Sequence, residues 1–271
     1  MLRFLFIILV LMATLIWWYS PGNKEDFSIT FLDVGQGDSI LFRFPGGETL
    51  LIDGGPGIDA DWLLQDYVSR YFCHINVLLL THPDADHISG LVRLLDHCTT
   101  NLVLHNPSSK DSNIYDRWLV NVTKFHGEEI YEGGKFSMSG VDFYVIWPPE
   151  NLEDENHNNH SISLLVDYGE FEGLLLGDLE NVWHTSILSN LRDLDQVIDR
   201  PIELMKAAHH GARNGLEEEL VSWVDPEVFV ISVGRDNSYG HPAPEVLEFL
   251  EGLGSRIYRT DRDGTVEISV R

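Results

Sequence analysis

Short apolar or alternating runs, separated by turn sequences, dominate the part of the chain that follows residue 26. Phe27–Leu32, Ser39–Phe44 and Thr49–Ile52 are such runs, and the turns GQGD and PGGE lie between them. Alternation with a period of two is typical of β-strands, and short turns connect strands that are neighbours. The pattern therefore predicts an antiparallel meander.

The segments that follow alternate between helical and extended patterns. Apolar residues recur at helical spacing over Trp62–Tyr71, a wholly apolar strand is expected at Val77–Leu80, and a further helix is expected from about Ile88 to His97. This alternating order of strands and helices predicts a sheet covered by helices.

The second half of the chain shows the same alternation of extended and helical patterns. Its expected strands are Ile162–Asp167, Gly173–Leu176, Ile202–Lys206 and Val228–Val233. Its expected helices are Val182–Leu191, Leu216–Val224 and Pro244–Leu253. Two similar α/β halves stacked sheet to sheet would bury the apolar faces of both sheets. Residues 106–121 and 150–160 lack periodicity and are expected to be loops that frame a site.

The first twenty residues differ from the rest of the chain. Phe4–Trp18 is apolar except for Thr14, and Arg3 is the only charged residue before Lys24. A segment of this length fits either a membrane anchor or a signal peptide. The aromatic cluster WWY at its end, and the lack of a small-x-small cleavage motif, favour a retained anchor. The positive-inside rule then directs the remainder of the chain out of the cytoplasm.

Cysteine usage and charge limit the function further. Cys73 and Cys98 are the two cysteines, and both a disulfide and two buried free thiols fit an extracytoplasmic chain. The 43 acidic and 18 basic residues give a formal net charge of -25, which repels polyanions at long range. Either bound metal ions offset this charge locally, or the substrate is not a long nucleic acid.

The densest group of chemically active residues follows the apolar strand at Val77–Leu80. The sequence THPDADH places four potential metal ligands within six residues, where a strand turns into a helix. These ligands are His82, Asp84, Asp86 and His87. Imidazole and carboxylate groups suit zinc or manganese.

Three further strands end in residues of the same kind. Asp178 follows an apolar strand and Gly177, although an Asp in this position commonly caps the next helix. His209 and His210 follow the strand that ends at Lys206, and His241 lies in the loop after Val228–Val233. Because strand ends gather at one edge of an α/β sheet, a shared site with two divalent metal ions, zinc or manganese, is expected.

Such a site predicts hydrolysis by a metal-activated hydroxide. The expected catalytic residues are Asp86, which positions the hydroxide, and His210 or Lys206, which assists the leaving oxygen. Positive charge beside the second-half motifs favours a phosphoester substrate over an uncharged amide or lactone. The expected substrate contacts are Arg213, Arg235 and Asn237.

Together these motifs resemble the metallo-β-lactamase domain of ComEC competence proteins. The resemblance runs from about residue 27 to 271 and rests on FLDVGQGDS, LLIDGG, LLLTHPDADHISGL, LLLGDLE, AAHHG, ISVGRDNSYGHP and YRTDRDGTVEISV. It implies a four-layer αββα sandwich, here preceded by one N-terminal hydrophobic helix. The expected domains are an anchor or uncleaved signal over 1–20, a linker over 21–26 and a hydrolase domain over 27–271.

The resemblance also implies roles for individual residues. His82, Asp84, Asp86, His87 and Asp178 would line the metal centre, and His209, His210 or His241 would complete it. Asp53 would brace the centre, and Asp33 and Asp38 are expected to be structural. The chain departs from the superfamily pattern H-x-H-x-D-H at Asp84, and the stretch 158–161 occupies the place of a further ligand His.

The expected function is that of a metal-dependent phosphodiesterase or nuclease, anchored to a membrane with its catalytic domain outside the cytoplasm, or else secreted. Its expected partners are a phosphodiester substrate, with DNA among the candidates, and the membrane. The alternatives are a hydrolase of a non-phosphate ester or lactone and a noncatalytic membrane accessory module.

Overall fold

The computed structural model describes residues 26–57, 63–68, 73–194, 196, 198 and 200–270. The predicted hydrophobic helix, and the linker apart from Asp26, lie outside these residues. Within the described ranges, no helix has both the length and the apolar character needed to cross a membrane.

The strands of the described chain form two seven-stranded sheets. In spatial order, the first sheet contains β14 (Val266–Val270), β1 (Phe27–Phe31), β2 (Ile40–Arg43), β3 (Thr49–Ile52), β4 (His74–Leu80), β5 (Thr99–His105) and β6 (Gly127–Glu129). The second contains β13 (Arg256–Arg259), β12 (Val228–Ile231), β11 (Leu204–Lys206), β10 (Phe171–Leu175), β9 (Ser163–Tyr168), β8 (Val141–Trp147) and β7 (Lys135–Met138). Strands β1, β2 and β3 pair antiparallel, as the meander predicted.

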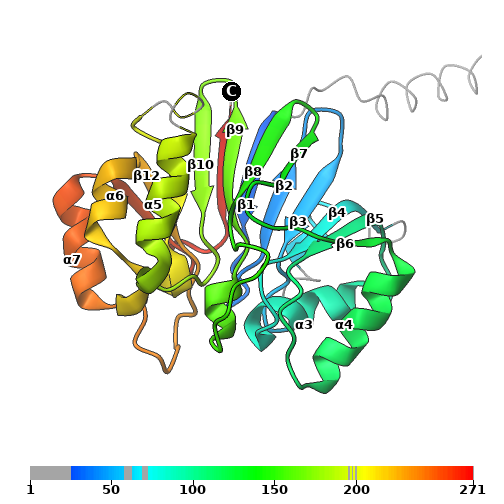
Figure 1. Cartoon of the computed structure of the whole chain (residues 1–271). Helices are drawn as coiled ribbons and strands as arrows, with labels where there is room; N and C mark the ends of the chain where they lie inside the picture. Colours follow the sequence, from blue (N-terminus) through cyan, green and yellow to red (C-terminus); the bar gives the residue numbers. More distant parts are fainter. Residues whose placement is uncertain are drawn as a thin grey trace, which may run out of the picture.

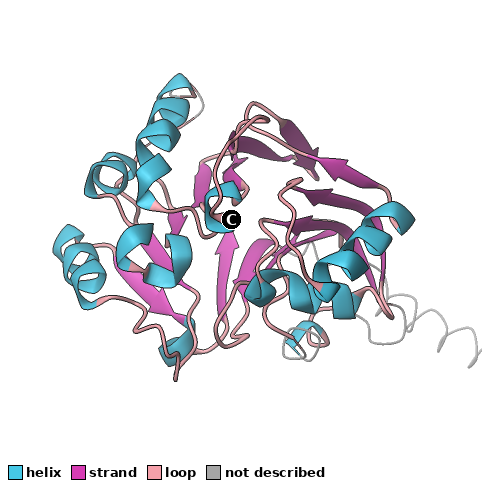
Figure 2. Cartoon of the chain, turned by 60° about the horizontal axis from the view of Figure 1, so that its bottom comes forward, coloured by secondary structure: helices cyan, strands magenta, loops and turns pink. Residues whose placement is uncertain are grey.

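Helices cover the outer face of each sheet, so the predicted αββα sandwich is confirmed (Figure 1). The first sheet carries α3 (Ala85–Leu94) and α4 (Asn113–Lys124), and the second carries α5 (His184–Asp193), α6 (Glu218–Val224) and α7 (Pro244–Leu253). The short helices are η1 (His157–His160), η2 (Asn181–Trp183), η3 (Ala208–Gly211), η4 (Arg213–Gly215) and α8 (Thr260–Asp263). Figure 2 shows the two helical layers on opposite sides of the sheets.

The alternation of side chains along each strand explains why both faces of both sheets are apolar. In β3, Leu50 and Ile52 lie in the core between the sheets, whereas Leu51 lies in the core beneath the helices. In the second sheet, Leu164 faces the first sheet and Leu165 faces the helices. Side chains of successive strand residues point to opposite faces, so a sheet covered on both sides is apolar throughout.

Strand direction brings the functional segments to one edge of the sandwich. Strands β3, β4 and β5 are parallel, so their carboxyl ends lie together. Strands β10, β11 and β12 are also parallel, and β8 runs in the same direction because it and β10 both pair antiparallel with β9. The loops that leave these strand ends frame the candidate site.

Some of the expected element boundaries were wrong. Residues 106–121 were expected to be a loop, but α4 begins at Asn113, where the Ser112 side chain accepts a hydrogen bond from the Tyr115 N–H. The helix buries little more than Tyr115 and Trp118, so its apolar stripe is too narrow to stand out. The residue pattern also missed β5, β6, β7, β8, β13 and β14. Of the helix expected over Trp62–Tyr71, only residues 63–68 lie within the described ranges.

Cys73 and Cys98 form a disulfide, which decides between the two states left open by the sequence. The bridge joins the residue before β4 to the residue before β5. The Thr99 N–H donates a hydrogen bond to the carbonyl oxygen of Cys73 beside it. The two parallel strands are thus joined covalently at the edge opposite the candidate site.

Candidate metal centre

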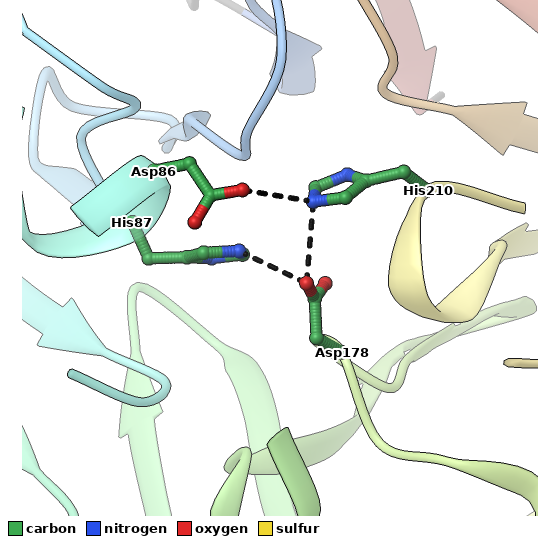
Figure 3. A group of neighbouring side chains, drawn as sticks. All are labelled: Asp86, His87, Asp178 and His210. Atoms are coloured by element: carbon green, nitrogen blue, oxygen red, sulfur yellow. Dashed lines mark hydrogen bonds and ion pairs between the residues drawn. The ribbon is translucent and has the colours of Figure 1, made fainter. Parts of the chain in front are cut away.

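Four side chains from three separate segments converge at the edge where the strands end (Figure 3). Asp86 and His87 lie in the first turn of α3, Asp178 follows β10, and His210 lies in η3 after β11. One ligand atom from each lies within 4.8 Å of all the others. The structure therefore brings together four of the predicted metal ligands.

Close backbone contact brings α3 to this position. Gly90 of α3 lies against Gly54, which follows β3, and a Cβ on Gly90 would lie 1.7 Å from the Gly54 carbonyl oxygen. The Gly54 N–H also donates a hydrogen bond of 2.8 Å to the carbonyl oxygen of His87. The glycines of LLIDGG and DHISGL thus let the helix approach the strand end, which places His87 beside Asp53.

The histidines of the group are oriented by hydrogen bonds at Nδ1. His87 Nδ1 lies 2.8 Å from Asp53 Oδ2, and His210 Nδ1 lies 2.9 Å from the Ser232 carbonyl oxygen. Both partners act as acceptors, so each Nδ1 carries the proton and each Nε2 faces the carboxylates. His87 Nε2 and His210 Nε2 both lie 3.2 Å from Asp178 Oδ2. This is how metal-binding histidines are commonly held.

His82 is prepared in the same way. The Thr81 hydroxyl donates a hydrogen bond of 2.6 Å to Asp53, so its oxygen can only accept from His82 Nδ1, which lies 3.0 Å away. Nδ1 then carries the proton, and Nε2 presents a lone pair. Burial lowers the pKa of His82 well below its ordinary value and keeps the ring neutral. His82 Nε2 is buried and has no hydrogen-bond partner among the described residues, as expected of an atom that faces a cation.

The electrostatics of the group also suit a cation. Burial lowers the pKa of His210, but Asp178 and Asp86 outweigh it and raise the pKa to about 9. Burial likewise acts against the charged form of His87, yet Asp178 and Asp53 raise the pKa of His87 well above its usual value. Carboxylates that stabilise a proton at each Nε2 also attract a metal ion, which would compete with that proton.

Lys206 lies beneath this group and does not reach the opening. Its side chain is fully buried, and Nζ forms an ion pair with Asp38 and donates a hydrogen bond of 3.1 Å to the Gly177 carbonyl oxygen. Nζ also lies 3.7 Å from Asp178 Oδ1. Asp38, Asp53 and His87 form a second group of potential ligands, but the Lys206 ammonium already supplies a cation to Asp38. Lys206 is therefore placed to position Asp178 and not to contact substrate.

The other predicted ligands, Asp84, His209 and His241, do not belong to this group of four. Asp84 Oδ1 lies 2.8 Å from Lys110 Nζ, in a half-buried ion pair. His209 Nε2 lies 3.3 Å from Asn158 Nδ2, and the rings of His209 and His241 are 5.8 Å apart.

The three predicted substrate contacts are engaged elsewhere. Arg213 is exposed and pairs with Glu245, and Arg235 Nε donates to the Asp261 carbonyl oxygen at 3.0 Å. The Asn237 amide donates to the carbonyl oxygens of Gly234 and His241, and its Oδ1 accepts from the N–H groups of Tyr239 and His241. These contacts assign Asn237 to holding its loop in shape. Asp33 has a similar local role, because its side chain accepts from the Gly35 N–H.

Sequence reasoning assigned no role to two residues that hold the centre. Thr81 contacts both Asp53 and His82, as described above. Ser161 Oγ lies 3.2 Å from His82 Nδ1 and accepts a 3.0 Å hydrogen bond from the Asp178 N–H. The stretch 158–161 was noted as occupying a ligand position, and this was the one available signal for Ser161.

The sequence is similar to those of known proteins. The sequence model of the metallo-beta-lactamase superfamily matches residues 32–235. The chain is 26% identical over 267 residues to ComE operon protein 3 of Bacillus subtilis, covering 91% of this chain and 33% of that protein. It is 29% identical over 265 residues to Recombination protein 2 of Haemophilus influenzae, covering 96% of this chain and 31% of that protein. The resemblance to competence proteins is confirmed, and the chain spans about a third of the length of these relatives.

Solved structures agree on the fold. A metal-dependent hydrolase of the beta-lactamase superfamily, Tm1679, superposes with a TM-score of 0.57 at 12% identity, covering 90% of this chain and 100% of that one. The diiron beta-hydroxylase CmlA from Streptomyces venezuelae gives a TM-score of 0.56 at 18% identity, covering 91% of this chain and 54% of that one. At these identities the likeness supports the architecture alone.

Proposed function

The chain belongs to the metallo-beta-lactamase superfamily, and on this premise we propose that it is a metal-dependent hydrolase that cleaves phosphodiesters. The observation that carries the proposal is the arrangement of three buried imidazoles. Each of His82, His87 and His210 has its Nδ1 hydrogen-bonded to an oxygen acceptor. The Nε2 atoms of His87 and His210 both lie 3.2 Å from Asp178 Oδ2, and His82 Nε2 is buried without a hydrogen-bond partner in the described structure. Imidazoles held through Nδ1 in this way are typical of metal-binding histidines.

We propose two unequal positions for divalent cations. Asp86, His87, Asp178 and His210 would hold the first. His82 would hold the second together with Asp178, whose Oδ1 is buried without a hydrogen-bond partner in the described structure. Asp84 would join the second position only after leaving Lys110. Zinc and manganese both suit this set of nitrogen and oxygen donors, and when bound such an ion supplies Lewis acidity that activates water and polarises a phosphoryl oxygen.

The protein's own residues keep this centre in shape. Asp53 and Ser232 fix the rings of His87 and His210, and Lys206 and Ser161 fix Asp178. The Asp86 side chain is 32% exposed, so the group opens to solvent at Asp86. Although burial acts to raise it, the hydrogen bond with His210 and the charge on His87 keep the pKa of Asp86 below its ordinary value. Asp86 is therefore a carboxylate at neutral pH, where a substrate would enter.

A phosphodiester is favoured over other esters by the relatives. One is named Recombination protein 2 and another is Competence protein ComA of Neisseria gonorrhoeae, and recombination is a process that acts on DNA. DNA is therefore one candidate substrate. The chain spans only about a third of these proteins, so their activities reach this chain only as part of this proposal.

The test combines metal content with turnover. We expect the full chain to retain divalent metal through dialysis and to hydrolyse bis-p-nitrophenyl phosphate with added manganese or zinc. Asp178→Asn should lose the metal and at least about a hundredfold in kcat/KM, because it removes a carboxylate shared by both positions. The matched control is Asp167→Asn, a half-buried change on β9 outside the centre. Equal metal content and turnover in the two variants would refute the proposal.

A second candidate is hydrolysis of an uncharged ester or lactone. It is favoured by the net charge of -25 and by the contacts that engage Arg213 with the Glu245 carboxylate and Arg235 with the Asp261 carbonyl oxygen. Turnover of an aryl lactone that exceeds turnover of bis-p-nitrophenyl phosphate, and that also disappears in Asp178→Asn, would select it. Metal binding without turnover of either substrate would favour an accessory module.

We also propose that the domain works outside the cytoplasm. The disulfide between Cys73 and Cys98 supports this location, because structural disulfides persist in oxidising compartments. Protease added to intact cells or spheroplasts should degrade the domain before a cytosolic marker. Protection of the domain until the cells are lysed would contradict this location.

A further inference from the structure

A cavity of about 480 Å³ lies beside the candidate metal centre, and the residues that line it have no role in the proposed hydrolysis. The loop after β5, the loop after β8 and η1 form its walls. The side chains that line it include those of Ser108, Ser109, Glu150, Leu152, Glu155 and His157. A volume of this size falls in the range of small-molecule sites, which is roughly 300–1,000 Å³.

The cavity opens at the same edge of the sandwich as the metal centre. Strands β5 and β8 end at the same edge as the strands that carry the metal ligands. Lys110, the residue after Ser109, pairs with Asp84 at 2.8 Å. Asn158, the residue after His157, lies 3.3 Å from His209. Residues that flank the centre therefore connect it to the cavity, and one arm of a substrate at the centre would extend toward the cavity.

The cavity wall is held rigidly by hydrogen bonds. The Asp154 carboxylate accepts from Asn159 Nδ2 at 2.8 Å and from Trp183 Nε1 at 3.0 Å. The Asp154 carbonyl oxygen lies 2.7 Å from His160 Nε2. Across the cavity, Ser108 Oγ lies 3.1 Å from His157 Nδ1 and joins the two loops. Because this wall is already ordered, a ligand binds without the entropic cost of ordering the wall.

The chemistry of the wall excludes anions and suits hydroxyl groups. Glu150 and Glu155 are both exposed carboxylates that accept hydrogen bonds. Ser109 offers a hydroxyl, and burial lowers the pKa of His157, so its ring is neutral at neutral pH. The neighbouring cation, Lys110, is already paired with Asp84. Leu152 adds one apolar surface against which a flat ring can pack.

We propose that this cavity binds an uncharged, hydroxyl-bearing group of nucleoside size on one side of the scissile phosphodiester. The inference rests on the proposed function for the position of the phosphate. It narrows the substrate to a phosphodiester with one neutral organic arm, because a further phosphate in the cavity would face Glu150 and Glu155. The cavity therefore selects against a continuing polyanionic strand.

The first test fills the cavity without touching the metal centre. Ser109→Trp places a large side chain on an exposed loop residue of the cavity wall. We expect thymidine to bind the metal-loaded full chain in calorimetry and to bind Ser109→Trp at least about tenfold more weakly. The matched control is Ser222→Trp, at an exposed serine of α6 that does not line the cavity. Absence of thymidine binding to the unmodified chain, or equal binding to both variants, would overturn the inference whether or not the chain is an enzyme.

The second test uses two chromogenic substrates that release the same product. With the p-nitrophenyl ester of thymidine 5′-phosphate, Ser109→Trp should lose at least about tenfold in kcat/KM, mainly through KM, while bis-p-nitrophenyl phosphate changes less than about twofold. Equal loss with both substrates would contradict a nucleoside site. No turnover of bis-p-nitrophenyl phosphate by the unmodified chain would refute the proposed function, and the thymidine experiment would still decide the inference.

The third test concerns charge. Glu150→Gln/Glu155→Gln should raise kcat/KM at least about threefold for the thymidine ester that carries an additional 3′-phosphate. The same change in charge at Glu248→Gln/Glu251→Gln, on the exposed face of α7, should have a smaller effect. If the two double variants respond alike, the selection comes from the overall charge of the protein and not from the cavity.

Discussion

Lys206, which directly precedes the AAHHG motif with its two histidines, stabilises the whole centre. Its charge is buried against Asp38, and both groups lie far from solvent. Although burial acts to lower it, Asp38 and Asp178 raise the pKa of Lys206 above its ordinary value. The Lys206 ammonium is therefore kept charged at neutral pH. Loss of either partner would leave the other buried beside a more distant opposite charge, Asp178 at 3.7 Å for Lys206 and His210 at 3.6 Å for Asp38.

Lys206→Met should destabilise the metal-free protein by about 3–5 kcal/mol, because the buried Asp38 carboxylate loses its ammonium partner and keeps His210 Nδ1, 3.6 Å away, as its remaining ion-pair partner in the described structure. Adding Asp38→Asn should recover much of that loss. Urea unfolding of the wild type, the two single variants and the double variant in EDTA measures the coupling. Additive losses in the double variant would show that the two side chains do not stabilise each other.

His184, a buried histidine at the start of α5, predicts a dependence of stability on pH. Burial lowers the pKa of His184 from 6.5 to about 4, despite a contact with the Leu179 carbonyl oxygen. The unfolded chain therefore binds a proton below pH 6.5 that the folded chain does not bind until about pH 4. Stability is complete above the unfolded pKa and falls across this window, by about 3 kcal/mol at its lower end.

His184→Gln should remove this part of the acid dependence, since glutamine does not titrate. Unfolding free energies measured from pH 7 to pH 4.5 should converge between the variant and the wild type as the pH falls. His126→Asn, at an exposed histidine, serves as the control and should leave the slope unchanged. A variant curve parallel to the wild type would mean that His184 is protonated in the folded protein.

At the scale of elements, the approach of α3 to the end of β3 decides whether the centre forms. Gly90→Ala places a Cβ inside the contact with Gly54, so the helix must move. We expect a loss of at least about 2 kcal/mol in stability and weaker metal retention, because His87 moves away from Asp53. Gly252→Ala in α7 is the matched control: nothing lies within 4 Å of its Cβ, and it should gain about 0.5–1 kcal/mol. Similar unfolding curves for both variants would contradict the close contact.

Elements in which apolar residues recur with a clear periodicity could be predicted from the sequence, whereas elements with a weak periodicity could not. The prediction of β3 and α7 was correct to the residue, because each is a continuous pattern bounded by turns or by proline. Helix α4 buries too few side chains to show a stripe, and β6 has only three residues, all of them exposed. Short exposed strands owe their structure to pairing with a neighbour, which a local pattern does not contain.

The same limit applies to the candidate site. Strand ends predicted the residues that converge, since Asp and His after an apolar run form a local signal. The ion pairs of Asp84 with Lys110 and of Lys206 with Asp38 join segments that are 26 and 168 residues apart. Nothing near either residue in the sequence indicates these pairs. The sequence thus predicted which residues gather but not which of them another charge already holds.

At the scale of the molecule, the net negative charge repels the anions that the cations near the centre would attract. The formal charge is -25, while Lys206 lies beneath the centre and Lys110 beside it, each paired with a carboxylate. The net charge therefore repels an approaching polyanion at long range. A small phosphodiester carries one charge and is repelled much less.

This difference predicts opposite responses to salt from an acidic and a basic nuclease. Raising KCl from about 20 to about 200 mM should increase kcat/KM for a single-stranded oligonucleotide at least about threefold, because screening weakens repulsion between like charges. The value for bis-p-nitrophenyl phosphate should change less than about twofold over the same range. A protein that binds DNA through basic residues loses affinity as salt rises, since the release of condensed counterions into a more concentrated salt solution is less favourable. A fall in oligonucleotide turnover with salt would therefore reveal a basic path to the centre, and would favour a long strand over a small phosphodiester as the substrate.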